Sequence, residues 1–195
     1  MKRIILASSS PRRIEMMKNN GYEPEIIPAH VDEEILIDTS CESAAMSMAL
    51  KKAAYIAEQI STDESSDNND GAVIIAADTI VVYGDEIMGK PVDQDDAYRM
   101  LSKLRNNYHQ VMTGVAIIDT SKKLKICFCD TTSVYFKDYT DEELLAYVKT
   151  SEPYDKAGGY AIQGTFGKYI DHFEGDYDNV VGFPWTRIEA EMKKL

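Results

Sequence analysis

Residues 6–13 read LASSSPRR and join a short apolar strand to the first helix of the chain. Ser10 has the side chain of a helix N-cap, and Pro11 suits the first helical position, so local chemistry specifies the turn well. Arg12 and Arg13 then stand in the first helical turn, where the free N–H groups are already positive. Each charge costs roughly 0.3 to 1 kcal/mol at an exposed helix start, unless an anion binds there.

The serine turn, residues 8–10, combines groups that hold phosphate in proteins. Hydroxyls, free backbone N–H groups and guanidinium groups meet at one helix start, and a bound anion would remove the charge conflict. We therefore predict an anion site built from Ser8, Ser10, Arg12 and Arg13. The alternative is that both arginines turn into solvent, as charged residues usually do.

Length and composition limit the class of the protein. A chain of 195 residues suits one large domain or two closely associated lobes, and 44% hydrophobic residues are enough for a buried core. No apolar run approaches the roughly 18 residues that span a bilayer, and the four apolar residues after the first three are too few for a signal peptide. We expect a cytoplasmic protein with no membrane partner, whose thiols at Cys41, Cys127 and Cys129 are reduced.

The formal net charge of −12 argues against nucleic acid as a partner, because affinity for duplexes comes mainly from Lys and Arg that neutralise phosphates. The same field would repel a polyphosphate ligand. Binding such a ligand therefore requires a concentrated basic pocket, a divalent cation, or both.

Hydrophobic periodicity predicts alternating strands and helices. Ser40, Asp93 and Thr140 are candidate N-caps of helices, and Pro184 suits the first turn of a closing helix. The polar stretches 61–71 and 175–179 are predicted to be loops. The predicted strands are residues 4–7, 25–27, 72–77 continuing through 80–83, 87–88, 109–118, 126–128, 134–136 and 169–173.

Two carboxylates follow predicted strands. Residues 72–77 form an apolar, β-branched run typical of a strand buried on both faces, and this run ends at Asp78. Because open α/β sheets place ligand chemistry at strand ends, and an unpartnered buried carboxylate is costly, we predict a functional role for Asp78. Glu33 lies in the acidic run 31–35, whose ordinary interpretation is a solvated edge.

Three lysines are candidate phosphate partners. Lys90 stands between a glycine and a proline, where a constrained backbone aims its ammonium group; Lys156 lies in the glycine-rich stretch 151–164. Lys52 lies on a predicted helix, where lysines ordinarily serve solubility. Phosphate held by cations beside metal-binding carboxylates is the apparatus of metal-assisted phosphoryl chemistry. The sequence has no P-loop or Rossmann glycine motif, so no motif supports the common kinase and dinucleotide-binding interpretations.

Nine short motifs follow one another along the chain: SSSPRR (8–13), VDE (31–33), KA (52–53), ADT (77–79), GKP (89–91), HQVMTG (109–114), DKAG (155–158), IQG (162–164) and NVVGFP (179–184). In these motifs the chain closely resembles the Maf proteins, which are nucleoside triphosphate pyrophosphatases. The resemblance runs from residue 4 to about residue 184. One such motif would be weak, but nine in the same order are specific.

The resemblance implies an α/β fold of the Maf/ITPase-like kind, an elongated mixed sheet flanked by helices, with two lobes around a central cleft in one domain, residues 1–195. It implies a housekeeping hydrolysis of nucleoside triphosphates to the monophosphate and pyrophosphate, with Mg²⁺ or Mn²⁺, by a homodimer. The family divides at three positions. Arg12, Thr79 and Gln163 match the branch that acts on dTTP and UTP, whereas the 7-methyl-GTP branch typically has Trp, Gln and Glu there.

The resemblance also implies a role for each motif residue. Asp78 is the proton acceptor that activates the attacking water, and Glu33 with Asp78 supports the metal. The amide of Gln163 suits uracil and thymine because it donates to O4 and accepts from N3–H at once. Whether Asp78 is base, metal ligand or both stays open. The substrate-binding residues are Ser8, Ser10, Arg12, Arg13, Lys52, Thr79, Lys90, Lys156 and Gln163.

The competing hypothesis is a non-catalytic nucleotide-binding regulator, since the Maf family is also associated with inhibition of septum formation during cell division. A binder can dispense with the carboxylates of Glu33 and Asp78, and this chain carries both. The sequence therefore favours an enzyme.

Overall fold

The computed structural model describes residues 2–32, 39–62 and 71–195. Glu33 and residues 63–70 of the predicted acidic loop lie outside the described residues. The chain divides into two compact units. Unit 1 comprises Met1–Thr79, Thr113–Asp130 and Gly182–Leu195, and unit 2 comprises Ile80–Met112 and Thr131–Val181.

The strands are β1 (Arg3–Leu6), β2 (Glu25–Ile26), β3 (Ala72–Tyr83), β4 (Glu86–Met88), β5 (Tyr108–Asp119), β6 (Leu124–Phe136) and β7 (Ile170–Glu174). The α-helices are α1 (Pro11–Asn19), α2 (Cys41–Thr62), α3 (Gln94–Leu104), α4 (Asp141–Val148), α5 (Tyr177–Val181) and α6 (Trp185–Met192). Three 3₁₀ helices are η1 (Glu152–Asp155), η2 (Ala157–Gly159) and η3 (Thr165–Tyr169). Among the described residues, no helix has both the length and the apolar character needed to cross a membrane.

The strands form one mixed sheet in the order β2-β1-β3-β5-β6-β7, with β4 paired to β3. The first strand, β1, is parallel to both β2 and β3, and its Ile5 pairs with Glu25 on one side and Ile74 on the other. Strand β4 pairs antiparallel with β3, and β7 pairs antiparallel with β6. This mixed sheet with flanking helices confirms the α/β class predicted from the sequence.

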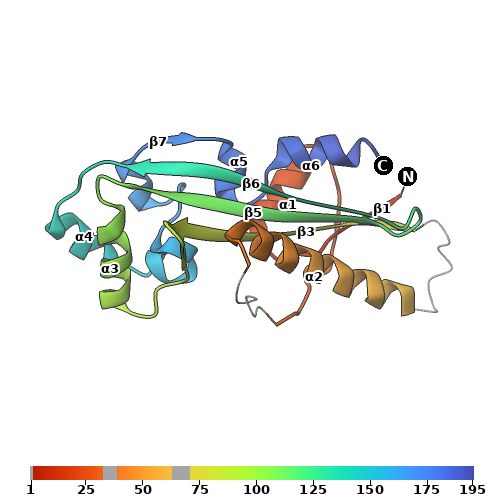
Figure 1. The fold of residues 1–195 in the computed structure, drawn as a ribbon, viewed down its shortest axis with the longest axis horizontal. Helices are drawn as coiled ribbons and strands as arrows, with labels where there is room; N and C mark the ends of the chain where they lie inside the picture. The colour runs from red at the N-terminus through yellow and green to blue at the C-terminus, as the bar shows by residue number, and fades with distance from the viewer. Residues whose placement is uncertain (1, 33–38, 63–70) are drawn as a thin grey trace. The chain divides into compact units, whose positions relative to one another are not determined.

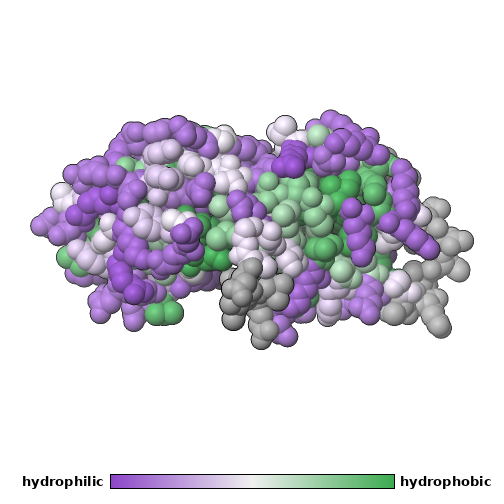
Figure 2. Space-filling view, in the orientation of Figure 1, coloured by the Kyte–Doolittle hydropathy of each residue, from purple (hydrophilic) through white to green (hydrophobic). Residues whose placement is uncertain are grey.

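Unit 1 buries both faces of its strands. Successive residues of a strand point to opposite faces of the sheet, and both sets are apolar here. In β3, Val73 and Ile75 belong to one apolar cluster with residues of α1 and α6. Ile74 and Ala76 belong to a second cluster with residues of α2. Figure 1 shows the matching arrangement, with α2 on one face of these strands and α1 with α6 on the other. Apolar residues also reach the surface of unit 1 between α6 and α2 (Figure 2).

Strand β5 and helix α2 approach each other most closely at Gly114. A Cβ atom added to Gly114 would lie 2.2 Å from the backbone carbonyl carbon of Ala45, which is far inside van der Waals contact. Only glycine allows this approach, so Gly114 fixes how α2 lies on the sheet.

Unit 2 is organised around an aromatic core. Phe166 of η3 is fully buried, and its ring lies 4.6 Å from Tyr147, 4.9 Å from Tyr169 and 5.1 Å from Tyr139, measured between centroids. Helix α3 adds Leu101 and other aliphatic side chains to the same cluster. The capping box predicted at Thr140 is present and begins α4.

Two segments differ from the sequence predictions. Residues 126–128 and 134–136 were predicted as separate strands, but β6 is continuous from Leu124 to Phe136. The predicted loop 175–179 contains the start of a helix, α5. One buried residue explains both differences. The hydroxyl of Thr132 accepts from Asp176 N at 3.1 Å and from Asn179 Nδ2 at 2.9 Å, which satisfies a polar strand residue and holds the start of the helix.

Candidate active site

The serine turn leaves the carboxyl end of β1 and leads into α1. Ser8 Oγ accepts a hydrogen bond from the backbone N–H of Ser10 at 3.2 Å, which stabilises the turn. Ser10 and Pro11 occupy the predicted N-cap and first helical positions, but the Ser10 side chain makes no capping hydrogen bond. The first turn of α1 contains no acidic residue, so its free N–H groups keep their positive field.

Arg13 connects three separate segments of unit 1. Its Nε donates to Gly182 O at 2.9 Å, and its Nη1 donates to Ala77 O at 2.7 Å and to Ser8 Oγ at 3.3 Å. Its Nη2 donates to Thr79 Oγ1 at 3.1 Å. The guanidinium group therefore ties the serine turn to the middle of β3 and to the segment before α6.

The charge of Arg13 survives this environment. Burial lowers the pKa of Arg13 to about 10, and the neighbouring Asp78 carboxylate opposes that effect. The guanidinium group is therefore charged at neutral pH. Arg12 is exposed on the same helical turn, so the two adjacent arginines have different surroundings.

Asp78 and Lys52 form an ion pair between β3 and α2. Lys52 Nζ lies 2.7 Å from Asp78 Oδ1, and the two side chains are 14% and 19% exposed. A pair this sheltered is screened less by salt than a surface pair. The sequence predicts Asp78 at the end of a buried strand, but β3 continues to Tyr83, so Asp78 lies within the strand, with a cation on one of its two oxygens.

Thr79 takes part in the same network. Besides accepting from Arg13, its hydroxyl lies 3.0 Å from Thr113 Oγ1 and donates to Gly182 O at 3.4 Å. Gly182 has φ +102°, and a Cβ added there would lie 3.0 Å from Thr79 Oγ1. Sequence reasoning gave Thr113 and Gly182 no role of their own, although both lie inside the motifs HQVMTG and NVVGFP.

Lys51 also has a defined position. Its Nζ donates to the backbone carbonyl of Asp32 at 2.7 Å, which ties α2 to the chain immediately before Glu33. No function is predicted for Lys51 from the sequence, because a lysine on a helix face carries no signal of a backbone partner. Since Glu33 lies outside the described residues, its role as metal ligand stays a prediction.

The other predicted substrate-binding residues lie in unit 2. Lys90 and Gln163 are exposed. Lys156 Nζ donates to the backbone carbonyl of Glu152 at 3.2 Å and pairs with the Asp155 carboxylate. A backbone hydrogen bond from Gly158 N to Gly89 O, 3.0 Å long, joins the segment of Lys156 to the turn of Lys90.

The predicted site residues thus form two groups, one in unit 1 and one in unit 2, and each group has its own contacts. Within unit 1, hydrogen bonds and an ion pair bring together Ser8, Arg13, Lys52, Asp78 and Thr79. Within the described residues, no three His, Cys, Asp or Glu side chains gather as a metal-binding group.

Comparison with known families settles the relationship. The family described as Maf-like protein matches residues 3–195. The chain belongs to the Maf family.

Curated Maf relatives match over the full length of this chain. A dTTP/UTP pyrophosphatase of Caldicellulosiruptor bescii is 43% identical over 100% of this chain and 96% of its own length. The dTTP/UTP pyrophosphatases of Geobacillus sp. (strain WCH70) and Bacillus cereus (strain AH820) are 42% and 43% identical, covering 99% and 96% of their own lengths. A solved HAM1 protein from Coxiella burnetii has a TM-score of 0.47 at 14% identity, over 70% of this chain and 73% of that chain.

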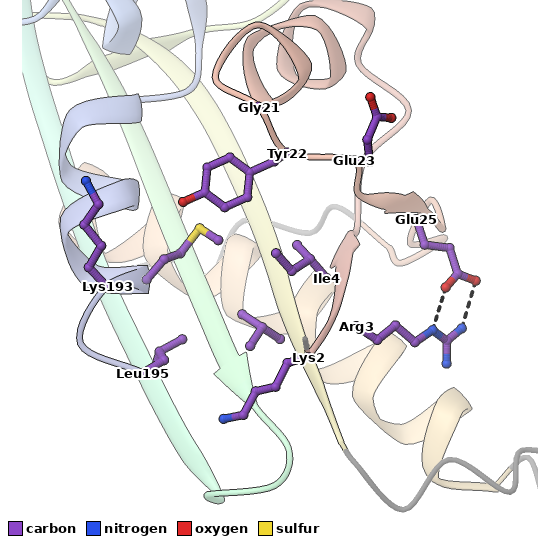
Figure 3. Close-up of a pocket in the computed structure, with 11 residues that line it drawn as sticks. Lys2, Arg3, Ile4, Gly21, Tyr22, Glu23, Glu25, Lys193 and Leu195 are labelled. Atoms are coloured by element: carbon purple, nitrogen blue, oxygen red, sulfur yellow. Dashed lines mark hydrogen bonds and ion pairs between the residues drawn. The ribbon is translucent and has the colours of Figure 1, made fainter.

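A separate pocket of about 670 Å³ in unit 1 of this Maf chain contains none of the predicted site residues. It is lined by Arg3 and Ile4 at the start of β1, by Tyr22 after α1, and by Leu195 at the end of the chain. Figure 3 shows Arg3 turned toward Glu25, with which it forms two hydrogen bonds. Because the serine turn follows the other end of β1, this pocket is not the candidate active site.

Proposed function

We propose that this chain hydrolyses dTTP and UTP to the monophosphate and pyrophosphate. The observation that carries the proposal is the arrangement of Arg13, Asp78 and Lys52 at the middle of β3, next to a helix start with free N–H groups. The curated relatives of this length bear the name dTTP/UTP pyrophosphatase, which supports the same activity.

In the proposed reaction, Asp78 accepts a proton from a water molecule. The oxygen of that water forms a bond to the α-phosphorus, and the bond between this phosphorus and the bridging oxygen breaks, so pyrophosphate leaves with the electron pair. Lys52 holds Asp78 Oδ1 at 2.7 Å, which orients the carboxylate. The serine turn and the N–H groups of α1 bind phosphate oxygens.

The proposed cofactor is Mg²⁺ or Mn²⁺. A carboxylate is a hard oxygen ligand with several lone pairs, so the ion pair of Asp78 with Lys52 leaves capacity for a metal, and Glu33 is the proposed second ligand. When bound, the cation neutralises charge on the phosphates during transfer. The lysines at 52, 90 and 156 offset the remaining phosphate charge.

Base selection is assigned to Gln163, with Arg12 and Thr79 as the other two positions that match the dTTP/UTP branch. Uracil and thymine present an acceptor at O4 and a donor at N3, which one amide satisfies. Cytosine reverses both groups and leaves the amide unpaired, so the enzyme should prefer UTP and dTTP over CTP by about tenfold or more. The proposal includes a cytoplasmic homodimer, as the family resemblance implies.

The test is pyrophosphate release from a panel of purine and pyrimidine nucleoside triphosphates, with Mg²⁺, with Mn²⁺ and with neither. We expect release from UTP and dTTP that depends on the cation. Binding of UTP without pyrophosphate release would support the regulator hypothesis instead. Release from purine triphosphates alone would contradict the assignment of Gln163 as well as the substrate class.

A further inference from the structure

Glu152 links η1 to the turn that carries Gln163. Its Oε1 accepts from the backbone N–H of Thr165 at 2.9 Å, and its Oε2 accepts from Thr165 Oγ1 at 2.7 Å. The hydroxyl of Tyr147, on α4, donates to Oε1 at 3.4 Å. A single half-buried carboxylate therefore receives three donors from two separate segments, two of them from the second residue after Gln163.

The packing at Gly164 gives a second observation. A Cβ atom added to Gly164 would lie 1.9 Å from Glu152 Oε1. The backbone of Gly164 has φ −92°, which any L-residue adopts without strain. A methyl group at this position would therefore displace the Glu152 carboxylate, although the backbone conformation itself accepts it.

The turn is closed on itself as well. Gly164 N donates to Ala161 O at 2.9 Å, and Gly167 N donates to Gly164 O at 3.0 Å, so Gln163 lies within a hydrogen-bonded turn. The hydroxyl of Tyr147 also donates to Gly159 O at 3.1 Å. Because burial, and then the nearby Glu152 carboxylate, raise the pKa of Tyr147, that hydroxyl stays protonated and remains a donor.

Glu152 also contacts Lys156, which is one of the lysines proposed to bind phosphate. Its backbone carbonyl accepts from Lys156 Nζ at 3.2 Å. One residue thus contacts, through its side chain, the turn of the base-reading amide and, through its main chain, a lysine assigned to phosphate.

We propose that Glu152 is a positioning residue for base recognition: its carboxylate holds Gly164 and Thr165 so that the amide of Gln163 faces the pyrimidine edge. This inference rests on the proposed function, because it needs Gln163 to read the base. It goes further by assigning selectivity to a residue that need not touch the nucleotide. We call the hydrogen bonds from Thr165 to the Glu152 carboxylate the clamp. Without the clamp the turn adopts other conformations, and the Gln163 amide then distinguishes uracil and thymine from cytosine less well.

The test compares kcat/KM for UTP, dTTP and CTP in the wild type, Glu152→Ala and Glu152→Gln. We expect Glu152→Ala to lower the UTP:CTP ratio by about tenfold, mainly through KM for UTP. Glu152→Gln should keep the wild-type ratio, because its amide oxygen still accepts from Thr165 N.

The matched control is Glu143→Ala, which removes another carboxylate of unit 2 that accepts a backbone N–H, that of Thr140. It weakens the start of α4 without touching the turn of Gln163. A purely structural loss lowers the active fraction for all substrates alike, so this control should leave the UTP:CTP ratio unchanged.

A second comparison uses the contact at Gly164. In the wild-type background Gly164→Ala should lower the UTP:CTP ratio, because the new methyl group displaces the Glu152 carboxylate. In the Glu152→Ala background the same change should have a much smaller effect, since the oxygen it would meet is gone. Equal effects in both backgrounds would overturn the proposal.

The other outcomes separate the two proposals. An unchanged ratio in folded Glu152→Ala overturns the role of Glu152 and leaves the pyrophosphatase standing. If Glu152→Ala fails to fold, Thr165→Val decides: it removes one donor and keeps the backbone bond, so a drop of about threefold supports the clamp and no drop overturns it. A wild type that releases no pyrophosphate from UTP or dTTP overturns the proposed function, and one that treats UTP and CTP alike overturns the roles of Gln163 and Glu152 together.

Discussion

Replacing Arg13 by alanine should destabilise unit 1 even without substrate. The guanidinium group donates to two buried backbone carbonyls, those of Ala77 and Gly182, at 2.7 and 2.9 Å. Leaving one buried acceptor unsatisfied costs about 1 to 3 kcal/mol, so the two together cost about 2 to 6 kcal/mol. Against a typical total stability of about 5 to 15 kcal/mol, this is a large loss.

The measurement is urea unfolding followed by fluorescence and far-UV circular dichroism. Trp185 is the only tryptophan of the chain and is buried in the same cluster of unit 1 as Phe183, so its emission reports on this unit. Arg12→Ala is the matched control, because it removes an identical but exposed side chain from the same helical turn. We expect the control to change the free energy of unfolding by at most about 0.5 kcal/mol.

Equal stability of Arg13→Ala and Arg12→Ala would refute this reasoning. It would mean that the hydrogen bonds of Arg13 are replaced by water at no cost, and that its role is confined to substrate. Arg13→Lys separates charge from geometry, because an ammonium group keeps the charge but cannot reproduce the fork of the guanidinium group. It should lose most of the stability that Arg13→Ala loses.

Three further predictions concern the reaction, the packing and the pH dependence. Asp78→Asn should lower kcat for UTP at least about 10²-fold with the fold retained, since it removes the proposed base. Gly114→Ala should destabilise unit 1 by at least about 1 to 3 kcal/mol in urea unfolding, because its Cβ would lie 2.2 Å from the Ala45 carbonyl carbon. Burial alone would raise the pKa of Asp119, but the hydrogen bond from Lys2, with others, lowers it to about 2. Because this pKa is depressed, the carboxylate stabilises the fold above pH 3.8, and the contribution disappears as the pH falls toward about 2. Acid unfolding should show the corresponding loss of stability.

Each of these predictions has a control. Asp85→Asn neutralises an exposed carboxylate in the turn after β3 and should leave kcat unchanged. Gly89→Ala adds a methyl group where nothing lies within 4 Å, so it should not affect stability as Gly114→Ala does. Lys2→Met removes a partner of Asp119 and should reduce the loss of stability on acidification. An identical acid transition in Lys2→Met and wild type would contradict the assigned cause.

Much of unit 1 follows from local signals in the sequence. A continuous apolar, β-branched run predicts the strand that begins at residue 72, and Ser40 Oγ accepts from the N–H of Ser43 as an N-cap should. These predictions succeed because the causes lie within a few residues of each other. Strand β6 could not be predicted in the same way. Its polar residue Thr132 is satisfied by Asp176 and Asn179, which are 44 and 47 positions away.

The two arginines show the same limit within the candidate site. In the sequence Arg12 and Arg13 are equivalent neighbours, and both were predicted to bind phosphate. Only the fold distinguishes them, because the carbonyls that receive the Arg13 guanidinium group come from residues 64 and 169 positions further along the chain. Phosphate binding by either arginine stays a prediction.

Thr79 shows how a residue that the family resemblance links to substrate choice can act at a distance from the base. Its hydroxyl oxygen is engaged by Arg13 Nη2 at 3.1 Å, by Thr113 Oγ1 at 3.0 Å and by Gly182 O at 3.4 Å. A hydroxyl offers one donor and two acceptor positions, so three such partners use all of them. We therefore expect Thr79 to act through the placement of Arg13, and so on both nucleotides, and not by contact with the base. A Thr79→Ser variant keeps the hydroxyl and should keep the UTP:CTP ratio, whereas Thr79→Val removes the hydroxyl and should lower the stability of unit 1 along with kcat/KM for both nucleotides.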